Sequence, residues 1–133
     1  MKTRIAAFVL GAGILSAAAP LLAHHSFAAE YDGNKKVTMT GAVTKVEWMN
    51  PHMFFYADIK DEKGNVVNWA FENGNLRGLL RRGWTKDSLK VGDTVTVNGS
   101  LAKDGSHRVN ANTVTLSDGR KVFAGSSAGD DYK

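Results

Sequence analysis

The sequence predicts one small all-β domain that contains a single short helix. Apolar and polar residues alternate along most of the chain after residue 36, as they do on strands with one buried face. Turn segments rich in Gly, Asp and Asn, such as Asp61–Asn65 and Ser117–Arg120, separate the alternating stretches. Only Leu76–Leu80 has helical spacing. The chain has 133 residues, 43% of them hydrophobic, which suits one globular domain but is too short for a TIM barrel.

The first expected strand covers residues 37–48 and contains a bend. Val37 and Val43 lie in one phase of the alternation, whereas Trp48 lies in the opposite phase. A change of phase within one strand predicts a β-bulge, which we place near Thr44–Lys45. Asn50-Pro51 then ends the strand and turns the chain.

The second and third strands are expected to form a hairpin. They cover Met53–Lys60 and Val66–Glu72, and the loop Asp61–Asn65 between them contains a Gly for the turn. Phe54 and Tyr56 alternate with the apolar residues and are therefore expected to face outward. The residues expected to face inward on this hairpin are Met53, Phe55, Ala57, Ile59, Val67, Trp69 and Phe71.

A short helix should follow the third strand. Leu76, Leu79 and Leu80 have the spacing of one apolar helical face. Asn75 suits the position before the first turn, and Gly83 suits the position after the last.

Two further strands are expected after the helix, at Thr94–Ala102 and about His107–Leu116. The second of them changes phase and should bend. Lys121–Phe123 returns along it after an Asp-Gly turn. We expect residues 124–133, rich in Gly, Ser and Asp, to form a disordered tail.

Three strands, a short helix and two strands, with a long kinked first strand, predict a five-stranded OB-like Greek-key barrel over residues 37–123. An open β-sandwich or roll is the alternative. Residues 24–36 are expected to form an N-terminal arm. The predicted core comprises Val46, Trp48, Phe55, Ile59, Trp69, Phe71, Leu80, Val95, Val97 and Val109.

Residues 1–23 have the pattern of a secretory signal peptide. Lys2 and Arg4 precede an apolar run that ends in small residues. Cleavage after Ala23 would make His24 the first residue of the mature protein and place it in the periplasm. A retained membrane anchor is the alternative, but Pro20 and two glycines interrupt the apolar run.

Charge and composition exclude several classes of function. The formal net charge is +4, and cleavage would halve it by removing Lys2 and Arg4, so the domain does not have the charge of a nucleic-acid binder. Cysteine is absent, which excludes thiol chemistry, disulfides and iron–sulfur clusters. We find no paired acids or catalytic triad and expect a protein that is not an enzyme, with no membrane contact after cleavage.

His24 and His25 form a candidate copper site at the predicted mature terminus. A free amine and the ring of the same His can chelate one metal, and Cu(II) favours nitrogen donors of this kind. His52, in the turn before the second strand, could supply a further nitrogen, and Met49 or Met53 a thioether. The alternatives are a solvated His pair, a His52 bonded to its own loop, and a Met53 that belongs to the core.

Trp48, Phe54 and Tyr56 form a candidate ligand or partner surface. Their rings could stack on a flat ligand or dock another envelope protein, although packing of the N-terminal arm would equally cover them. Around the helix, basic residues suggest an anionic partner or simply a solvated face. They are Arg77, Arg81, Arg82 and Lys86.

Six segments resemble a family of small exported proteins of Gram-negative bacteria, known as a domain of unknown function. They are His24–Phe27, Thr40–Trp48, Asn50–His52, Asn68–Glu72, Leu79–Trp84 and Val122–Ser127. The resemblance covers almost the whole mature chain and implies export, but it implies no activity. Thr38–Gly41 before a kinked strand also resembles periplasmic OB-fold proteins, which act as binding modules.

Three hypotheses follow from these observations. The first is a periplasmic binding protein that holds copper through His24, His25 and His52. The second is a structural OB-like module that docks an envelope protein without metal. The third, a metal-dependent redox enzyme, has the least support.

Overall fold

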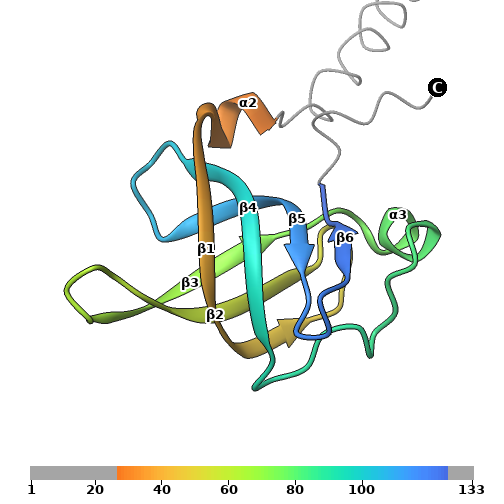
Figure 1. Cartoon of the computed structure of the whole chain (residues 1–133). Helices are drawn as coiled ribbons and strands as arrows, with labels where there is room; N and C mark the ends of the chain where they lie inside the picture. The colour runs from red at the N-terminus through yellow and green to blue at the C-terminus, as the bar shows by residue number, and fades with distance from the viewer. Residues whose placement is uncertain (1–26, 126–133) are drawn as a thin grey trace, which may run out of the picture.

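The computed structural model describes residues 27–125 and shows an all-β protein with two short helices (Figure 1). The elements in chain order are α2 (Phe27–Glu30), β1 (Tyr31–Glu47), β2 (Phe54–Lys60), β3 (Val66–Glu72), α3 (Leu76–Arg81), β4 (Thr94–Ala102), β5 (Arg108–Thr115) and β6 (Lys121–Phe123). Within residues 27–125, neither helix has the length and hydropathy needed to cross a membrane.

The strands form one sheet in the order β3-β2-β1-β4-β5-β6. Neighbours in this order are antiparallel, and β3 also pairs with β5 in parallel, from Ala70 opposite Arg108 to Glu72 opposite Asn110. The expected number of five strands was too small. Residues 121–123 form a sixth, because the turn at Gly119, where φ is 83°, returns the chain onto β5.

The predicted bends are confirmed as irregularities of the register. The pairing of β1 with β2 shifts between Val43 and Lys45, where the change of phase places a bulge. On β5, Asn98 faces Thr113 while Gly99 faces Ala111, which leaves Asn112 as an extra residue. Each extra residue increases the local bend and twist of its strand.

Two glycines allow neighbouring strands to approach closely. A Cβ atom on Gly41 would lie 2.2 Å from the carbonyl oxygen of Asp58, and one on Gly99 would lie 2.3 Å from that of Asn110. No side chain fits at such distances, so β1 can lie against β2, and β4 against β5, only with Gly at these positions.

The first strand begins earlier than expected, at Tyr31 and not at Val37. Tyr31 is 2% exposed and pairs with Ala102 of β4, and the amide of Lys103 donates to the carbonyl of Glu30 at 2.9 Å. Residues 31–36, expected in an arm, therefore belong to the sheet.

The end of the domain also extends beyond the expected boundary. Ala124 and Gly125 are buried, although we expected the tail to begin at residue 124. Ala124 donates its amide hydrogen to the carbonyl of Asn112 at 2.8 Å and accepts one from Gly74 at 3.0 Å. The remaining tail, residues 126–133, lies outside the described residues.

The core lies between the strands and is closed by α3 and Trp84. Its largest fully buried side chains include Trp84, Phe55, Phe71, Met53 and Leu79. Four predicted core residues lie at its margin, where they are only partly buried and pack against it: Val46, Trp48, Ile59 and Trp69.

The prediction that Leu80 belongs to the core is wrong. Leu80 is 55% exposed, whereas Leu79 is fully buried and Leu76 packs beside it. A helix of six residues presents one narrow face to the core, and successive residues point about 100° apart around its axis. The predicted caps are confirmed: Asn75 Oδ1 accepts from the Gly78 amide at 2.8 Å, and Gly83 has a φ of 87°.

Candidate functional site

The turn between β1 and β2 carries His52 beside the end of β3. Backbone hydrogen bonds tie this turn to the chain after β3: the Met53 amide donates to Gly74 at 3.1 Å, and the Asn73 amide donates to Met53 at 2.8 Å. Met53 itself is fully buried, which confirms its place in the core. His52 is thereby held next to Glu72, the last residue of β3.

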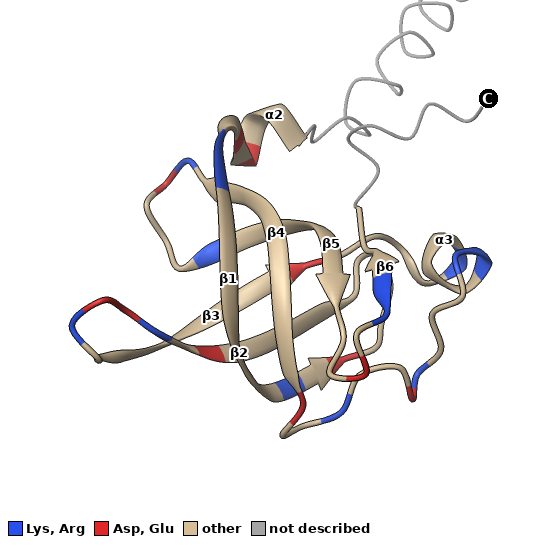
Figure 2. Ribbon diagram, viewed as in Figure 1, with Lys and Arg blue, Asp and Glu red and all other residues tan. Residues whose placement is uncertain are grey.

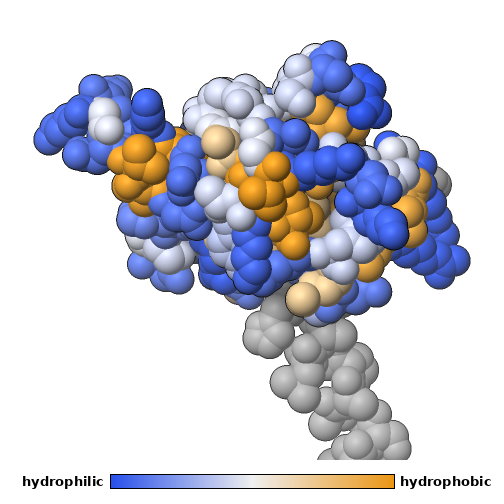
Figure 3. Space-filling model, turned by 90° about the horizontal axis from the view of Figure 1, so that it is seen from below, coloured by the Kyte–Doolittle hydropathy of each residue, from blue (hydrophilic) through white to orange (hydrophobic). Residues whose placement is uncertain are grey.

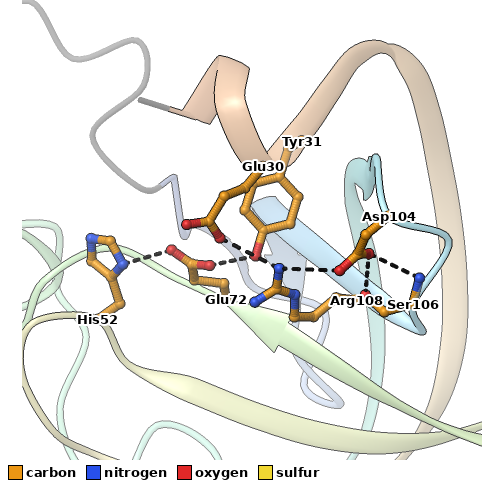
Figure 4. Close-up of polar contacts among 7 residues, drawn as sticks. All are labelled: Glu30, Tyr31, His52, Glu72, Asp104, Ser106 and Arg108. Atoms are coloured by element: carbon orange, nitrogen blue, oxygen red, sulfur yellow. Dashed lines mark hydrogen bonds and ion pairs between the residues drawn. The ribbon is translucent and has the colours of Figure 1, made fainter. Parts of the chain in front are cut away.

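Glu72 joins His52 to Tyr31. Its Oε1 atom lies 2.6 Å from Nδ1 of His52, and its Oε2 atom accepts a hydrogen bond from the hydroxyl of Tyr31 (Figure 4). The side chain of Glu72 is 8% exposed and that of His52 is 36% exposed. With each oxygen bound to one donor, the carboxylate has a defined orientation, and so does the imidazole that it holds.

The second nitrogen of His52 points away from Glu72 (Figure 4). With the hydrogen of a neutral ring on Nδ1, the lone pair is on Nε2. No residue between 27 and 125 makes a hydrogen bond to that atom. His52 therefore presents an oriented nitrogen donor at a partly exposed position.

Two side chains pack against the ring of Tyr31. Phe27 stacks on it with ring centroids 5.8 Å apart, and the guanidinium of Arg108 lies 5.6 Å from its centroid. Burial, reinforced by the hydrogen bond to Glu72, raises the pKa of Tyr31 far above its usual value. The hydroxyl therefore remains a proton donor to Glu72 throughout the physiological range.

Arg108 connects α2 to the hairpin between β4 and β5. Its Nη2 atom lies 3.4 Å from Glu30 and 3.9 Å from Asp104. The hydroxyl and amide of Ser106 both donate to Asp104, and these bonds lower the pKa of that carboxyl group. The Nε atom of Arg108 is buried and has no hydrogen-bond partner within residues 27–125.

Sequence reasoning missed the role of Glu72, because it found no paired acids and gave this residue no partner. Its partners are distant in the chain, with Tyr31 separated from it by 41 positions. The length of the hairpin loop between β2 and β3 could have indicated that His52 lies near Glu72. The short loop at 61–65 sets a register in which Phe54 faces Glu72, so that His52 must lie close to the end of β3.

Of the predicted copper ligands, the structure locates only His52. His24 and His25 lie outside the described residues. Within residues 27–125 there is no group of three or more His, Asp or Glu residues placed to hold a metal ion. A metal at His52 would therefore need donors from elsewhere. Met49, the other possible thioether, is 52% exposed.

Part of the predicted aromatic surface is already used inside the protein. Trp48 packs against the core, and the hydroxyl of Tyr56 donates to Glu47 at 3.1 Å. Lys45 forms an ion pair with Glu47 and lies 5.2 Å from the Tyr56 ring centroid. Burial raises the pKa of Tyr56, and the hydrogen bond from Lys45 lowers that of Glu47. Phe54 lies between Glu47 and Glu72 in the sheet register.

Lys and Arg residues occur on α3 and on the neighbouring β6 (Figure 2). Arg77 and Arg81 are exposed, whereas the guanidinium of Arg82 lies 4.4 Å from the Phe123 ring centroid. Seen from below, the apolar residues of the surface form separate small patches among hydrophilic ones (Figure 3). Arg82 thus has a packing role, and an anionic partner for this cluster stays a prediction.

Residues 11–111 match a family model described as a family of unknown function (DUF6152). The protein belongs to this family. The matched region includes Tyr31, His52, Glu72 and Arg108, so the whole network around Glu72 lies within it. No curated protein and no solved structure was found to match the chain.

Proposed function

We propose that this DUF6152 protein is a small exported binding protein that holds a copper ion. The site comprises His52 and the two histidines at the mature N-terminus, His24 and His25. One observation carries the proposal: Nδ1 of His52 lies 2.6 Å from the buried carboxylate of Glu72, which leaves Nε2 as the donor.

A carboxylate behind a histidine is a recurring feature of metal sites. The carboxylate accepts the hydrogen of one ring nitrogen, fixes the tautomer and orientation of the ring, and makes the other nitrogen a better donor. Glu72 is placed to do this, and Tyr31 holds Glu72 in turn. Copper suits the proposal because imidazole and amine nitrogens bind Cu(II) more strongly than they bind the other common divalent metals.

The remaining donors would come from the N-terminus. Cleavage after Ala23 frees the amine of His24, which can chelate together with its own ring. Phe27, the first described residue, packs on Tyr31, whose hydroxyl reaches Glu72. His25 is two residues before Phe27, so the histidine pair adjoins in sequence the segment that packs on Tyr31.

The proposal is for binding in the periplasm and not for catalysis. The signal-like segment at residues 1–23 supports export. The carboxylate of Glu72 holds the imidazole of His52 in one orientation, with the ring partly exposed. Ligand binding is therefore the simplest use of this arrangement.

We also infer that the sheet is an OB-like barrel. The pairings β3-β2-β1-β4-β5, together with the parallel pairing of β5 with β3, join five strands in a closed circuit. The short helix between β3 and β4 and the bulged first strand agree with that fold. The site at His52 would then lie on the loop between the first two strands, where OB-folds contact ligands.

The test is a calorimetric titration of the correctly processed protein with Cu(II). We expect His52→Ala to weaken binding at least tenfold and acetylation of the His24 amine to remove most of the affinity, because the acetylated nitrogen no longer offers a lone pair to the metal. His107→Ala is the matched control, since His107 is exposed and packs on Trp69 at 4.9 Å. Equal affinity of the acetylated and native termini would show that the amine is not a ligand.

Absence of Cu(II) binding in every version would contradict the copper proposal. It would favour the second hypothesis, a partner-docking module that uses Trp48, Phe54 and Tyr56. Phe54 adjoins Glu72 in the register, so a partner on this surface would also cover the His52 site.

A further inference from the structure

A second candidate site lies on the outer face of β1, β4 and β5, and it shares no residue with the His52 network. It is a groove of about 260 Å³. Its lining residues are Lys36, Val37, Thr38, Asn98, Gly99 and Asn112. The groove is small for a ligand pocket, which suits a ligand about the size of a single sugar.

The register of the sheet explains the groove. Thr38 faces Asn98 on one side, Lys36 faces Ser100 on the other, and Val37 faces Gly99 between them. Since side chains alternate across a strand, the first two pairs point outward and the third contributes its backbone. Gly99 has no side chain, and the extra residue Asn112 bends β5 at the same level.

The walls of the groove carry hydrogen-bonding groups in a fixed arrangement. Thr38 Oγ1 donates to Asn98 Oδ1 at 2.6 Å, and Asn98 Nδ2 donates to Thr113 Oγ1 at 3.2 Å. These bonds hold the side chains in place and leave the lone pairs of Thr38 Oγ1 and one Asn98 N–H available.

Lys36 is the charged residue among the lining side chains. Its Nζ atom donates to Ser100 Oγ at 3.0 Å, which holds the ammonium at the groove with two further N–H donors. No acidic side chain lines the groove. An anion placed at Lys36 would therefore meet no repulsion from the lining.

We propose that this groove binds a small hydroxylated carboxylic acid of the sugar-acid class. The ligand carboxylate pairs with Lys36, and its hydroxyl groups exchange hydrogen bonds with Thr38 and Asn98. The class follows from the lining, which offers one positive charge and several neutral donors and acceptors, but no aromatic ring for an apolar ligand. The proposal is independent of copper binding at His52.

The test is an NMR titration of the protein with glucuronate, with glucose and acetate as comparison ligands. We expect glucuronate to shift the amide signals of Gly99 and Asn112 and to bind at least tenfold more tightly than either comparison ligand. Glucose lacks the charge and acetate lacks the hydroxyl groups, so each removes one half of the proposed recognition.

Two pairs of variants make the test specific. Lys36→Met should weaken glucuronate binding at least tenfold, and Lys35→Met, at the neighbouring exposed position, should leave it unchanged. Thr38→Val should weaken binding, and Thr40→Val should not, although both threonines bond across the same strands, Thr40 with Thr96 at 2.8 Å.

Three results would overturn the proposal. One is the absence of saturable shifts at Gly99 and Asn112. Another is equal binding of acetate and glucuronate, which would reduce the site to a point of general anion attraction. The third is an equal effect of Lys35→Met and Lys36→Met, which would show that the response comes from surface charge and not from the groove.

Discussion

Tyr31, the first residue of β1, donates its hydroxyl hydrogen to Glu72, the last residue of β3. This bond joins the start of β1 to the side chain that orients His52. The two strands are not neighbours in the sheet, so the contact depends on how the sheet curves. It makes the N-terminal segment and the His52 turn parts of one arrangement.

Glu72→Gln should weaken Cu(II) binding by about 10- to 100-fold, the usual effect of losing a carboxylate behind a ligating histidine. The amide keeps the shape of the side chain but removes its charge. Calorimetric titration measures the change. Asp58→Asn is the matched control, because Asp58 accepts a hydrogen bond from Asn68 at 2.7 Å on another part of the sheet. Equal losses in both variants would mean that Glu72 does not act through His52.

Tyr31→Phe should lower the free energy of unfolding by about 1–3 kcal/mol, because it leaves a buried carboxylate oxygen of Glu72 without its donor. Urea denaturation followed by tryptophan fluorescence measures this change. Tyr56→Phe should have a smaller effect, since Tyr56 is partly exposed and water can replace its bond to Glu47. A Tyr31→Phe protein as stable as the original would contradict a structural role for this bond.

Stability should fall at alkaline pH through Tyr31. Burial and the hydrogen bond to Glu72 raise the pKa of Tyr31 in the folded state, so the folded state favours the protonated hydroxyl. The contribution of the protonated Tyr31 hydroxyl to the free energy of unfolding is complete below the ordinary tyrosine pKa of about 10, and it decreases as the pH rises above that value. Melting temperatures at about pH 8 to 11 should fall less steeply for Tyr31→Phe than for the original protein. Identical slopes would contradict this assignment.

Trp84→Ala should destabilise the metal-free protein by about 3–5 kcal/mol, because Trp84 is fully enclosed and its Nε1 atom donates to the carbonyl of Phe123 at 3.0 Å. Trp69→Ala should cost less, since that ring is only partly buried. Leu80→Ala, at an exposed position, should change stability by no more than about 0.5 kcal/mol. Denaturation without metal measures all three changes. We expect the domain to fold without metal, because its core is apolar, and a disordered metal-free protein would contradict this.

Local features of the fold were predictable from the sequence because their causes are local. The third and fourth strands, the cap at Asn75 and the bulge after Val43 all agree with the structure. Each depends on the alternation of side chains or on the chemistry of a turn within a few residues. The same reasoning placed Met53 in the core from its phase alone.

Features that depend on distant segments were not predictable in this way. Residues 31–36 have little apolar alternation, yet they begin β1 because β4 and Tyr31 hold them. Leu79 and Leu80 are adjacent residues of the same type, so the sequence does not distinguish them. Only the position of α3 against the core buries Leu79 and exposes Leu80. The buried tail residue Ala124 likewise depends on Asn112 and Gly74.

The candidate site divides along the same line. The sequence by itself determined that His52 lies in the turn before β2 and that Glu72 ends β3, because alternation and turn chemistry set those positions. Only the tertiary structure decided that Glu72 orients His52 and is itself held by Tyr31. The physical reason is that a hydrogen bond needs its two atoms within about 3 Å, and for residues far apart in the chain the packing of the whole sheet sets that distance.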